Sequence, residues 1–359
     1  MSKIASHILP PPSAELKQDL AMVLPTLRVA ESAEIKAFSF GEPIAVDQAM
    51  SQATSLLRES KAPAIIGLSG LTIEAMRETI ALAESMRAML LPWPFLPWPY
   101  GDVAAARQSI AQTATLGHAA SADLRVAFRD DPTRQDSPID QWITQRVPNT
   151  LFVDGADLEA LLRLRAKVRE QGAAVFTSMT ALPVKSIVVT LPAGVDCRIE
   201  SQWHALAADA QQKIRISVMT LPDLRAAGNQ RGAMEVMTWQ TGLSGAAGGI
   251  TFADGAPRPC PGASELLELG AIDTALDTGL TPLPPVLTQR LRHRIRISAA
   301  LDESADLCFI TPGLSPGLRA QVMRFDGTIL WLCDDPSPKS DAMDDPAIAL
   351  ISQLKQRVS

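Results

Sequence analysis

The sequence predicts an α/β fold built from two units, each a parallel sheet covered by helices. A helix, a buried strand and a second helix follow one another between residues 46 and 90, a succession typical of parallel α/β architecture. The same alternation recurs along the rest of the chain. Its 359 residues also exceed the roughly 250–300 at which a single hydrophobic core stops growing. Two α/β units are therefore expected.

The first unit opens with three consecutive elements. Residues 46–60 space their apolar side chains as one face of a helix does. The stretch APAIIGLSG (62–70) predicts a buried strand that runs into glycines. Residues 71–90 predict a long helix with Thr72 as its N-cap, because a threonine hydroxyl can accept a hydrogen bond from a free backbone N–H of the first turn.

The later elements follow the same pattern, and the chain ends are different. Strands are predicted at 123–132, 149–157, 173–179, 185–192, 214–219, 306–313 and 328–336, and helices at 157–172 and around 203–213. Residues 262–279 predict a helix and then a strand, as do residues 287–299. The N-terminal segment 1–45 is irregular and proline-punctuated, with one short amphipathic piece around Ala14–Leu27. The tail 337–346 is polar and precedes a terminal helix over 347–357.

Charge and composition exclude several classes of partner. The net charge is −6 and the pI about 5.4, so no general attraction to nucleic acid or to an anionic membrane is expected. No apolar run suits a signal peptide or reaches the ~20 residues of a membrane span, which predicts a cytoplasmic protein. Four cysteines lie far apart with no C-x-x-C spacing, so neither disulfides nor a thiolate metal site is predicted.

No local pattern indicates a catalytic constellation. The turn IGLSGLT (66–72) could cradle a phosphate, but the structural interpretation is favoured because no dinucleotide or phosphate-loop fingerprint accompanies it. The four histidines are isolated in sequence. His118 is the best-placed acid or base, although a hydrogen-bonded structural role is favoured. The glycine-rich run 242–255 predicts either close approach of the backbone to a flat ligand or a tight loop between domains.

The stretch LPWPFLPWPYG (91–101) repeats a Leu-Pro-Trp-Pro unit and closes on Tyr100, the only tyrosine of the chain, and Gly101. Proline excludes a helix here and disfavours a central strand, which would lose a hydrogen bond at each proline. Two interpretations stand: an aromatic loop that grips a ligand, and a plug that fills space.

Four collinear stretches resemble a known family. They are APAIIGLSGLTIEAMRETIALAESMRAML (62–90), TATLGHAASADLRVAF (113–128), NQRGAMEVMTWQTGLSGAAGGITFADGAPRPCPGASELLELGAIDTAL (229–276) and ADLCFITPGLSPGLRAQVMRFDGTILWL (305–332). Their order is similar to that of the B subunit of formylmethanofuran dehydrogenase, a branch of the molybdopterin/tungstopterin oxidoreductases, over roughly 45–335.

The resemblance implies two interlocked Rossmann-like parallel-sheet domains of the molybdopterin-oxidoreductase type. Residues 46–103 and 200–336 would form one discontinuous α/β domain, and 104–199 an inserted one. Residues 337–359 would be a C-terminal tail and helix. The irregular segment 1–45 would stand in place of the family's iron–sulfur domain.

Three departures from the family concern its metal site. Segment 1–45 has no cysteine, so the family's [4Fe–4S] cluster cannot form. The family's metal-binding Cys-His-Gly falls near Pro99, Tyr100 and Gly101, and proline cannot ligate a metal. The family's acidic pterin-nucleotide turn corresponds to TGLTPLP (278–284), which has no acid. The resemblance therefore implies a chain that binds no molybdenum or tungsten pterin and no iron–sulfur cluster, and it favours the plug interpretation of 91–101.

A branch of the family with the same losses is the formyltransferase/hydrolase complex of methylotrophic bacteria. The resemblance implies a non-catalytic B-type component, whose partners would be an amidohydrolase (A-type), a formyltransferase (D-type) and a C-type component. That complex converts formyl-tetrahydromethanopterin to formate through a methanofuran-like carrier. No residue of this chain would be catalytic. Two alternatives stand: a residual pterin-dependent redox enzyme, and a module that binds the carrier in the vacated cleft, with Arg231 and Arg324 holding its anionic tail.

Overall fold

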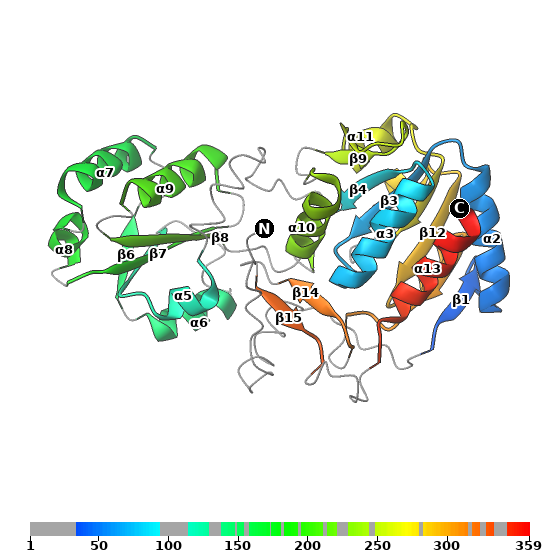
Figure 1. Cartoon of the computed structure of the whole chain (residues 1–359), viewed down its shortest axis with the longest axis horizontal. Helices are drawn as coiled ribbons and strands as arrows, with labels where there is room; N and C mark the ends of the chain where they lie inside the picture. The colour runs from blue at the N-terminus through cyan, green and yellow to red at the C-terminus, as the bar shows by residue number, and fades with distance from the viewer. Residues whose placement is uncertain are drawn as a thin grey trace, which may run out of the picture.

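The computed structural model describes most of the chain as two lobes (Figure 1). The described residues are 34–93, 114–128, 138–147, 149–153, 158–172, 174–180, 183–192, 195–210, 214–220, 229–243, 248–279, 283–314, 318–323, 328–333 and 343–359. Both lobes consist of a sheet with helices packed on it, which confirms the predicted α/β fold.

The larger lobe contains a nine-stranded sheet in the order β10-β9-β4-β3-β11-β12-β13-β1-β2. The strands in that order are Arg258–Cys260, Gly249–Thr251, Met89–Trp93, Pro63–Leu68, Thr274–Asp277, His293–Ser298, Leu307–Ile310, Lys36–Ser39 and Glu42–Ile44. The five central strands, β4 to β13, are parallel, and the flanking strands are antiparallel. The carboxyl ends of the central strands therefore meet at one edge of the sheet.

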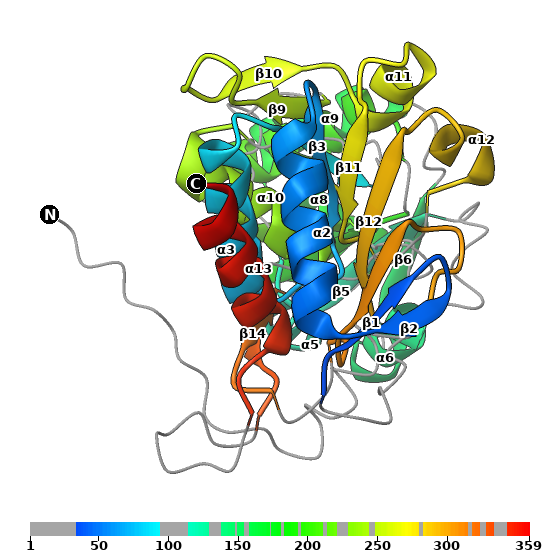
Figure 2. The same ribbon diagram turned by 90° about the vertical axis from the view of Figure 1, so that its right-hand side faces the viewer.

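Helices cover the two faces of this sheet unequally. The first face packs on α2 (Val46–Glu59), α3 (Ile73–Ser85), α10 (Gln230–Thr241) and α13 (Pro346–Val358). Figure 2 shows α2, α3 and α13 side by side over it. The second face packs on the shorter α11 (Ala263–Glu268) and α12 (Pro285–Thr288), over β4, β3 and β11 only. Thr72 caps α3 as predicted, because its hydroxyl accepts from the Ala75 N–H.

The smaller lobe is a four-stranded parallel sheet in the order β6-β5-β7-β8. Its strands are Thr150–Val153, Leu124–Phe128, Ser186–Leu191 and Arg215–Thr220. Helices α7 (Leu158–Gln171), α8 (Ala174–Thr180) and α9 (Cys197–Ala210) cover one face, and α5 (Leu116–Ala120) and α6 (Pro138–Arg146) the other. A separate ribbon pairs β14 (Gln321–Met323) with β15 (Ile329–Trp331). The predicted domain limits stay a prediction. The irregular structure predicted for 1–45 is wrong at its end, because Lys36–Ser39 and Glu42–Ile44 gain ladder hydrogen bonds as β1 and β2 of the nine-stranded sheet.

The strand predicted at 173–179 is wrong, because Ala174–Thr180 forms helix α8. Val175 and Phe176 are buried against the sheet of the smaller lobe, and the Thr180 hydroxyl donates to the Phe176 carbonyl at 2.9 Å, one helical turn back. An apolar run of seven residues is too short for its periodicity to separate a strand from a buried helical turn.

The predicted helix over 71–90 is too long, and strand β4 takes its end. Helix α3 ends at Ser85, and Arg87 adopts a positive φ of 54° that turns the chain into β4. The prediction that proline keeps this stretch out of a central strand is wrong for Pro92, which pairs with Gly67 of β3. The neighbouring strand β9 reaches only Met89 and Leu90, so the sheet makes no ladder on that side at Pro92.

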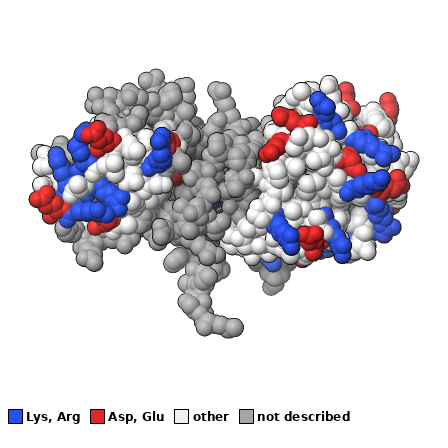
Figure 3. Space-filling model, turned by 90° about the horizontal axis from the view of Figure 1, so that it is seen from above, with Lys and Arg blue, Asp and Glu red and all other residues white. Residues whose placement is uncertain are grey.

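Surface charge is mixed on the face shown in Figure 3, where acidic and basic side chains are interspersed on both lobes. On the smaller lobe, Asp209 pairs with Arg165 at 2.5 Å and with Arg169 at 2.8 Å. A search for membrane-spanning helices within the described ranges finds none that is long and apolar enough.

Candidate functional site

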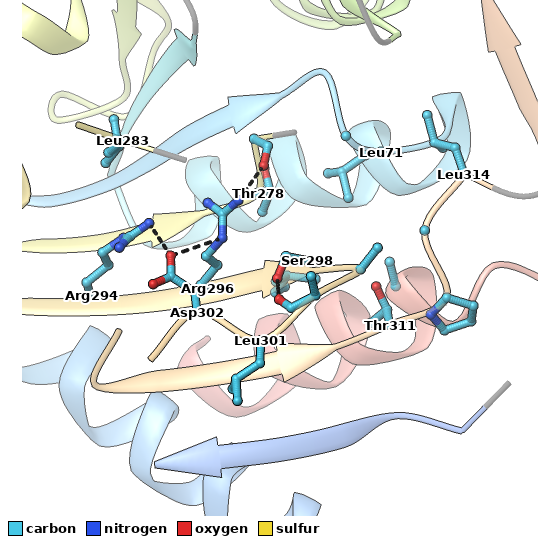
Figure 4. Close-up of a pocket in the computed structure, with 18 of the residues that line it drawn as sticks. Leu71, Thr278, Leu283, Arg294, Arg296, Ser298, Leu301, Asp302, Thr311 and Leu314 are labelled. Atoms are coloured by element: carbon cyan, nitrogen blue, oxygen red, sulfur yellow. Dashed lines mark hydrogen bonds and ion pairs between the residues drawn. The ribbon is translucent and has the colours of Figure 1, made fainter. Parts of the chain in front are cut away.

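A pocket of about 870 Å³ opens at the carboxyl edge of the nine-stranded sheet (Figure 4). Its walls come from the segments that follow β3, β11, β12 and β13, and from the start of α13. Ligands of open parallel sheets bind at this edge, and the volume lies within the range of roughly 300–1,000 Å³ usual for small-molecule sites. This pocket is therefore the candidate functional site of the described chain.

The floor of the pocket depends on a tight crossing of two strand ends. Gly67 has a φ of +110°, and a Cβ placed there would lie 2.3 Å from the Gly279 nitrogen. The Leu68 N–H donates to the Thr278 hydroxyl at 3.2 Å, and the Thr278 N–H donates to the Ile66 carbonyl at 2.8 Å. Only glycine combines this backbone conformation with this approach, so β3 and β11 are fixed to each other here.

The start of α3 is satisfied by the protein itself. The Thr72 hydroxyl donates to the Asp345 carboxylate at 2.7 Å, and Asp345 also accepts from the Ala347 N–H at the start of α13. Burial raises the pKa of Asp345, against the effect of these two hydrogen bonds. Since a carboxyl group already occupies the position beside the helix cap, the structural interpretation of the turn 66–72 is supported over the phosphate cradle.

Two arginines and two aspartates form a buried cluster under the pocket. Arg294 and Arg296 alternate on β12 and so point to the same face. Their guanidinium groups reach the Asp277 carboxylate at 2.8 and 2.5 Å, and Asp277 is fully buried. Arg294 also reaches Asp302 at 2.8 Å, and Arg296 reaches it at 3.4 Å (Figure 4).

This cluster balances its own charge. Two guanidinium groups face two carboxylates, and Arg296 donates further to the Gly279 carbonyl at 3.0 Å, while Arg294 donates to the Ser304 hydroxyl at 2.9 Å. Burial pushes the pKa of Asp302 up, but hydrogen bonds from Ser304 and the charges of both arginines hold it below its usual value. The arginines therefore stabilise the connection after β12, and the pocket holds no surplus positive charge for an anionic ligand.

The connection between β12 and β13 contains no helix. It consists of residues 299–306 and returns across the second face of the sheet, where Asp302 lies on the arginines. Parallel strands are usually joined by a crossover of a dozen or more residues with a helix that covers the sheet. The short connection leaves the pocket open on this side.

The outer part of the pocket is largely apolar. Leu71, Leu283, Leu301 and Leu314 line it, and Leu301 is still 38% exposed. Thr311 also lines the pocket and is buried. The pocket therefore offers an apolar surface beside polar groups, among them the exposed side chain of Glu303.

The described histidines and cysteines do not supply a catalytic group to this pocket. His118 accepts from the Thr115 N–H and completes the cap of α5, so its favoured structural role is supported. Burial raises the pKa of the Cys260 thiol to about 11 and also raises that of Cys308. Within the described ranges, no group of three or more His, Cys, Asp or Glu side chains is placed to hold a metal ion.

The asparagine segment at 229–232 has a packing role. The Asn229 amide donates to the Leu71 carbonyl at 2.8 Å and accepts from the Met323 N–H at 2.8 Å, so it ties the α3 entrance to β14. A Cβ at Gly232 would lie 2.2 Å from the Asn229 amide oxygen, which explains the glycine. Arg231 pairs with Glu235 at 2.6 Å on α10 and is not among the residues lining the pocket.

The remaining predicted features are four site residues and the glycine-rich run 242–255. Arg324, Pro99, Tyr100 and Gly101 lie outside the described residues, so the plug interpretation and the carrier interpretation stay predictions. In the glycine-rich run, Gly248 and Gly249 approach their own chain, because a Cβ at Gly249 would lie 2.3 Å from the Leu91 side chain. These two glycines serve packing between strands of one sheet.

Sequence reasoning missed the charged cluster entirely. The signal was available in HRIRIS (293–298), where arginines alternate with isoleucines in a strand buried on both faces. A buried arginine needs a carboxylate, and Asp277 ends the neighbouring strand. The strand order decides which carboxylates pair with the two arginines, and no local sequence pattern predicts that order.

Comparison with known proteins finds similarity among solved structures. No protein-family model matches the sequence, and no curated protein sequence matches it. Among solved structures, a chain in the crystal structure of the formyltransferase/hydrolase complex (FhcABCD) from Methylorubrum extorquens in complex with methylofuran is similar, with a TM-score of 0.66 and 20% identity. The match covers 90% of this chain and 98% of that chain. At this identity the likeness establishes the shared fold.

Proposed function

We propose that this chain is a non-catalytic, B-type component of a formyltransferase/hydrolase complex. In such a complex it would assemble with an amidohydrolase, a formyltransferase and one further, C-type component. The complex would convert formyl-tetrahydromethanopterin to formate through a methanofuran-like carrier. The observation that carries the proposal is the end-to-end fold likeness, over 90% of this chain and 98% of the other, to a chain crystallised in a complex of that kind.

The chemistry of the pocket supports a structural role. Its two arginines are neutralised by Asp277 and Asp302. Burial raises the pKa of Cys260 and of Cys308, and neither thiol lines the pocket. The described residues that line the pocket include no thiol ligand for a molybdenum or tungsten ion, and no step is assigned to such a group.

Purification from the source cells tests the proposal. An affinity-tagged full-length chain should co-purify with its three partner proteins, and the complex should release formate from formyl-tetrahydromethanopterin. Thr311→Val, which removes a hydroxyl from the pocket lining at nearly constant volume, should leave that rate within about twofold. Stoichiometric molybdenum or tungsten in the complex, or recovery of the chain without partners, would refute the proposal.

A second candidate function is binding of the carrier in the pocket. The supporting observation is the size of the pocket together with its apolar wall and buried hydroxyl. Binding of methylofuran to the isolated chain, lost in Thr311→Val, would favour this role. Replacing Arg231 and Arg324 by alanine tests whether an anionic tail is held, and unchanged affinity would exclude that contact. Carrier-dependent dye reduction tests the residual redox activity.

A further inference from the structure

The second face of the nine-stranded sheet exposes apolar side chains near its β1–β2 edge. Ala37 and Ile44 pack with the core of the first face, so alternation along the two strands points Phe38 and Pro43, which are paired, to the second face. Pro43 is exposed, Phe38 is half-buried, and Leu301, in the connection between β12 and β13, is 38% exposed. Exposed apolar side chains that gather on one face mark an interaction surface.

The turn of the β1–β2 hairpin adds an aromatic side chain that is 71% exposed, that of Phe40. Phe40 and Gly41 join the paired residues Ser39 and Glu42, and both have a positive φ, of 48° and 81°. Two-residue turns of this kind favour Asn followed by Gly, and a bulky residue with a positive φ is strained. The turn is nevertheless fixed, because β1 also pairs with β13 and the Phe40 N–H donates to the Asp306 carbonyl at 3.1 Å. The hairpin therefore presents a strained aromatic residue rigidly to solvent, which indicates a function for it.

Carboxylates border this turn. The exposed Glu42 follows it, and the exposed Glu303 packs on it, because its side chain would lie 3.7 Å from a Cβ at Gly41. Lys36 lies at the opposite end of β1, and the exposed Arg292 precedes β12, two strands away in the sheet. A complementary surface would carry basic side chains around an apolar pocket. A second copy of the chain, with the same carboxylates and a net charge of −6, would be repelled, as would an anionic membrane.

We propose that Phe40 anchors this chain to a protein partner that offers an apolar pocket with a basic rim, and that Phe38, Pro43 and Leu301 complete the contact. The inference rests on the proposed function, because the partner would be one of the other components of that assembly. It adds to the proposed function the face of the chain that makes the contact and the chemistry of the surface that receives it. Aromatic side chains that fill a pocket at the centre of an interface typically supply much of its binding energy.

The variant Phe40→Asn separates binding from folding. It places Asn before Gly41, the order that this turn favours, so the hairpin should be at least as stable while the anchor is lost. Biolayer interferometry of the full-length chain on its immobilised partner components should give a dissociation constant at least about tenfold higher. Leu162→Gln is the matched control, because Leu162 is a 45% exposed leucine on α7 of the smaller lobe, and its affinity should stay within about twofold. Unchanged affinity of Phe40→Asn, or equal loss in both variants, would overturn this docking face and leave the assembly intact. An unaltered chain that binds none of the components would refute the assembly itself and this contact with it.

Two further measurements identify the occupant. In hydroxyl-radical footprinting of the unaltered chain, oxidation of Phe40 should fall several-fold in the complex relative to the isolated chain, whereas that of Leu162 should not. Glu42→Lys should weaken binding and reduce its dependence on salt, because it reverses one carboxylate of the rim. Equal oxidation of Phe40 with and without the partners would overturn the proposal. A dimer of the isolated chain that Phe40→Asn abolishes would overturn it as well, because a second copy would then be the occupant.

Discussion

Replacing Asp277 by alanine should be among the most damaging single changes in the larger lobe. Asp277 is fully buried at the end of β11 and neutralises Arg294 and Arg296, both of which are also buried. Its other oxygen accepts from the Gly279 N–H at 3.1 Å. The change leaves two guanidinium groups with one carboxylate, Asp302. Removing one partner of a buried ion pair typically costs about 3–5 kcal/mol, because the remaining charge stays desolvated.

The chain has two lobes, so its unfolding need not be a single two-state transition, and a local probe is preferable. Native-state hydrogen exchange at the amides of β11 and β12 reports the opening free energy of the affected region directly. Asp277→Ala should lower that free energy by about 3–5 kcal/mol. Asp277→Asn, which keeps the side-chain shape, should lower it by less if it retains the bond to the Gly279 N–H.

Asp254→Ala is the control, because it removes an aspartate–arginine ion pair that is exposed instead of buried. Asp254 pairs with Arg258 at 3.0 Å, but both side chains are more than 60% exposed. Water screens this pair, so its loss should cost at most about 1 kcal/mol. If Asp277→Ala were no more damaging than Asp254→Ala, the buried cluster would not stabilise the sheet, and the account of the pocket floor would be wrong.

Three further changes test other parts of the structure. Gly67→Ala should destabilise the larger lobe far more than Gly242→Ala, as measured by urea denaturation. A Cβ at Gly67 would lie 2.3 Å from the Gly279 backbone, whereas a Cβ at Gly242, which also has a positive φ, would have nothing within 4 Å. Similar losses of stability in the two variants would contradict the tight crossing. Because burial raises the pKa of Asp345 above 3.8, the folded chain binds a proton that the unfolded chain releases, so this group makes stability fall as the pH rises from about 3.8 through the raised pKa. Asp345→Asn should flatten that part of the stability–pH curve. An unchanged slope would mean that another group causes the pH dependence, for example Glu74, because burial raises its pKa as well. Cys260, with a pKa of about 11, should be about one-thousandth thiolate at pH 8. Its alkylation, followed by mass spectrometry, should therefore be far slower than that of a thiol with an ordinary pKa. Rapid modification would show that the thiol is not held in its buried site.

Much of the fold follows from local pattern. The strand at Pro63–Leu68, the cap at Thr72 and the helix that follows were predictable, because burial periodicity and capping are encoded within a few residues. The α/β class followed from the alternation of such elements. The resemblance implied an α/β fold with two domains. The structural likeness to a chain from a formyltransferase/hydrolase complex supports the α/β fold.

Local pattern failed where contacts between distant segments decide the outcome. Helix α3 stops at Ser85 because Met89–Trp93 gains a parallel ladder with β3, and Pro92 is tolerated because β9 does not extend that far. The short run at Ala174–Thr180 became a helix because Val175 and Phe176 pack on the sheet from one side. In each case tertiary packing outweighs a propensity of less than about 1 kcal/mol per residue.

The amino-acid sequence alone determined most of the element types, the net charge of −6 and the scattered thiols of this protein. The tertiary structure decided the site. Asp277, Arg294 and Asp302 come from three separate stretches, and only the order β11-β12-β13 brings their charges together. The pocket exists because the chain after β12 returns in eight residues without a helix. Strand order and chain return are properties of long-range pairing, and for that reason no window of sequence contains them.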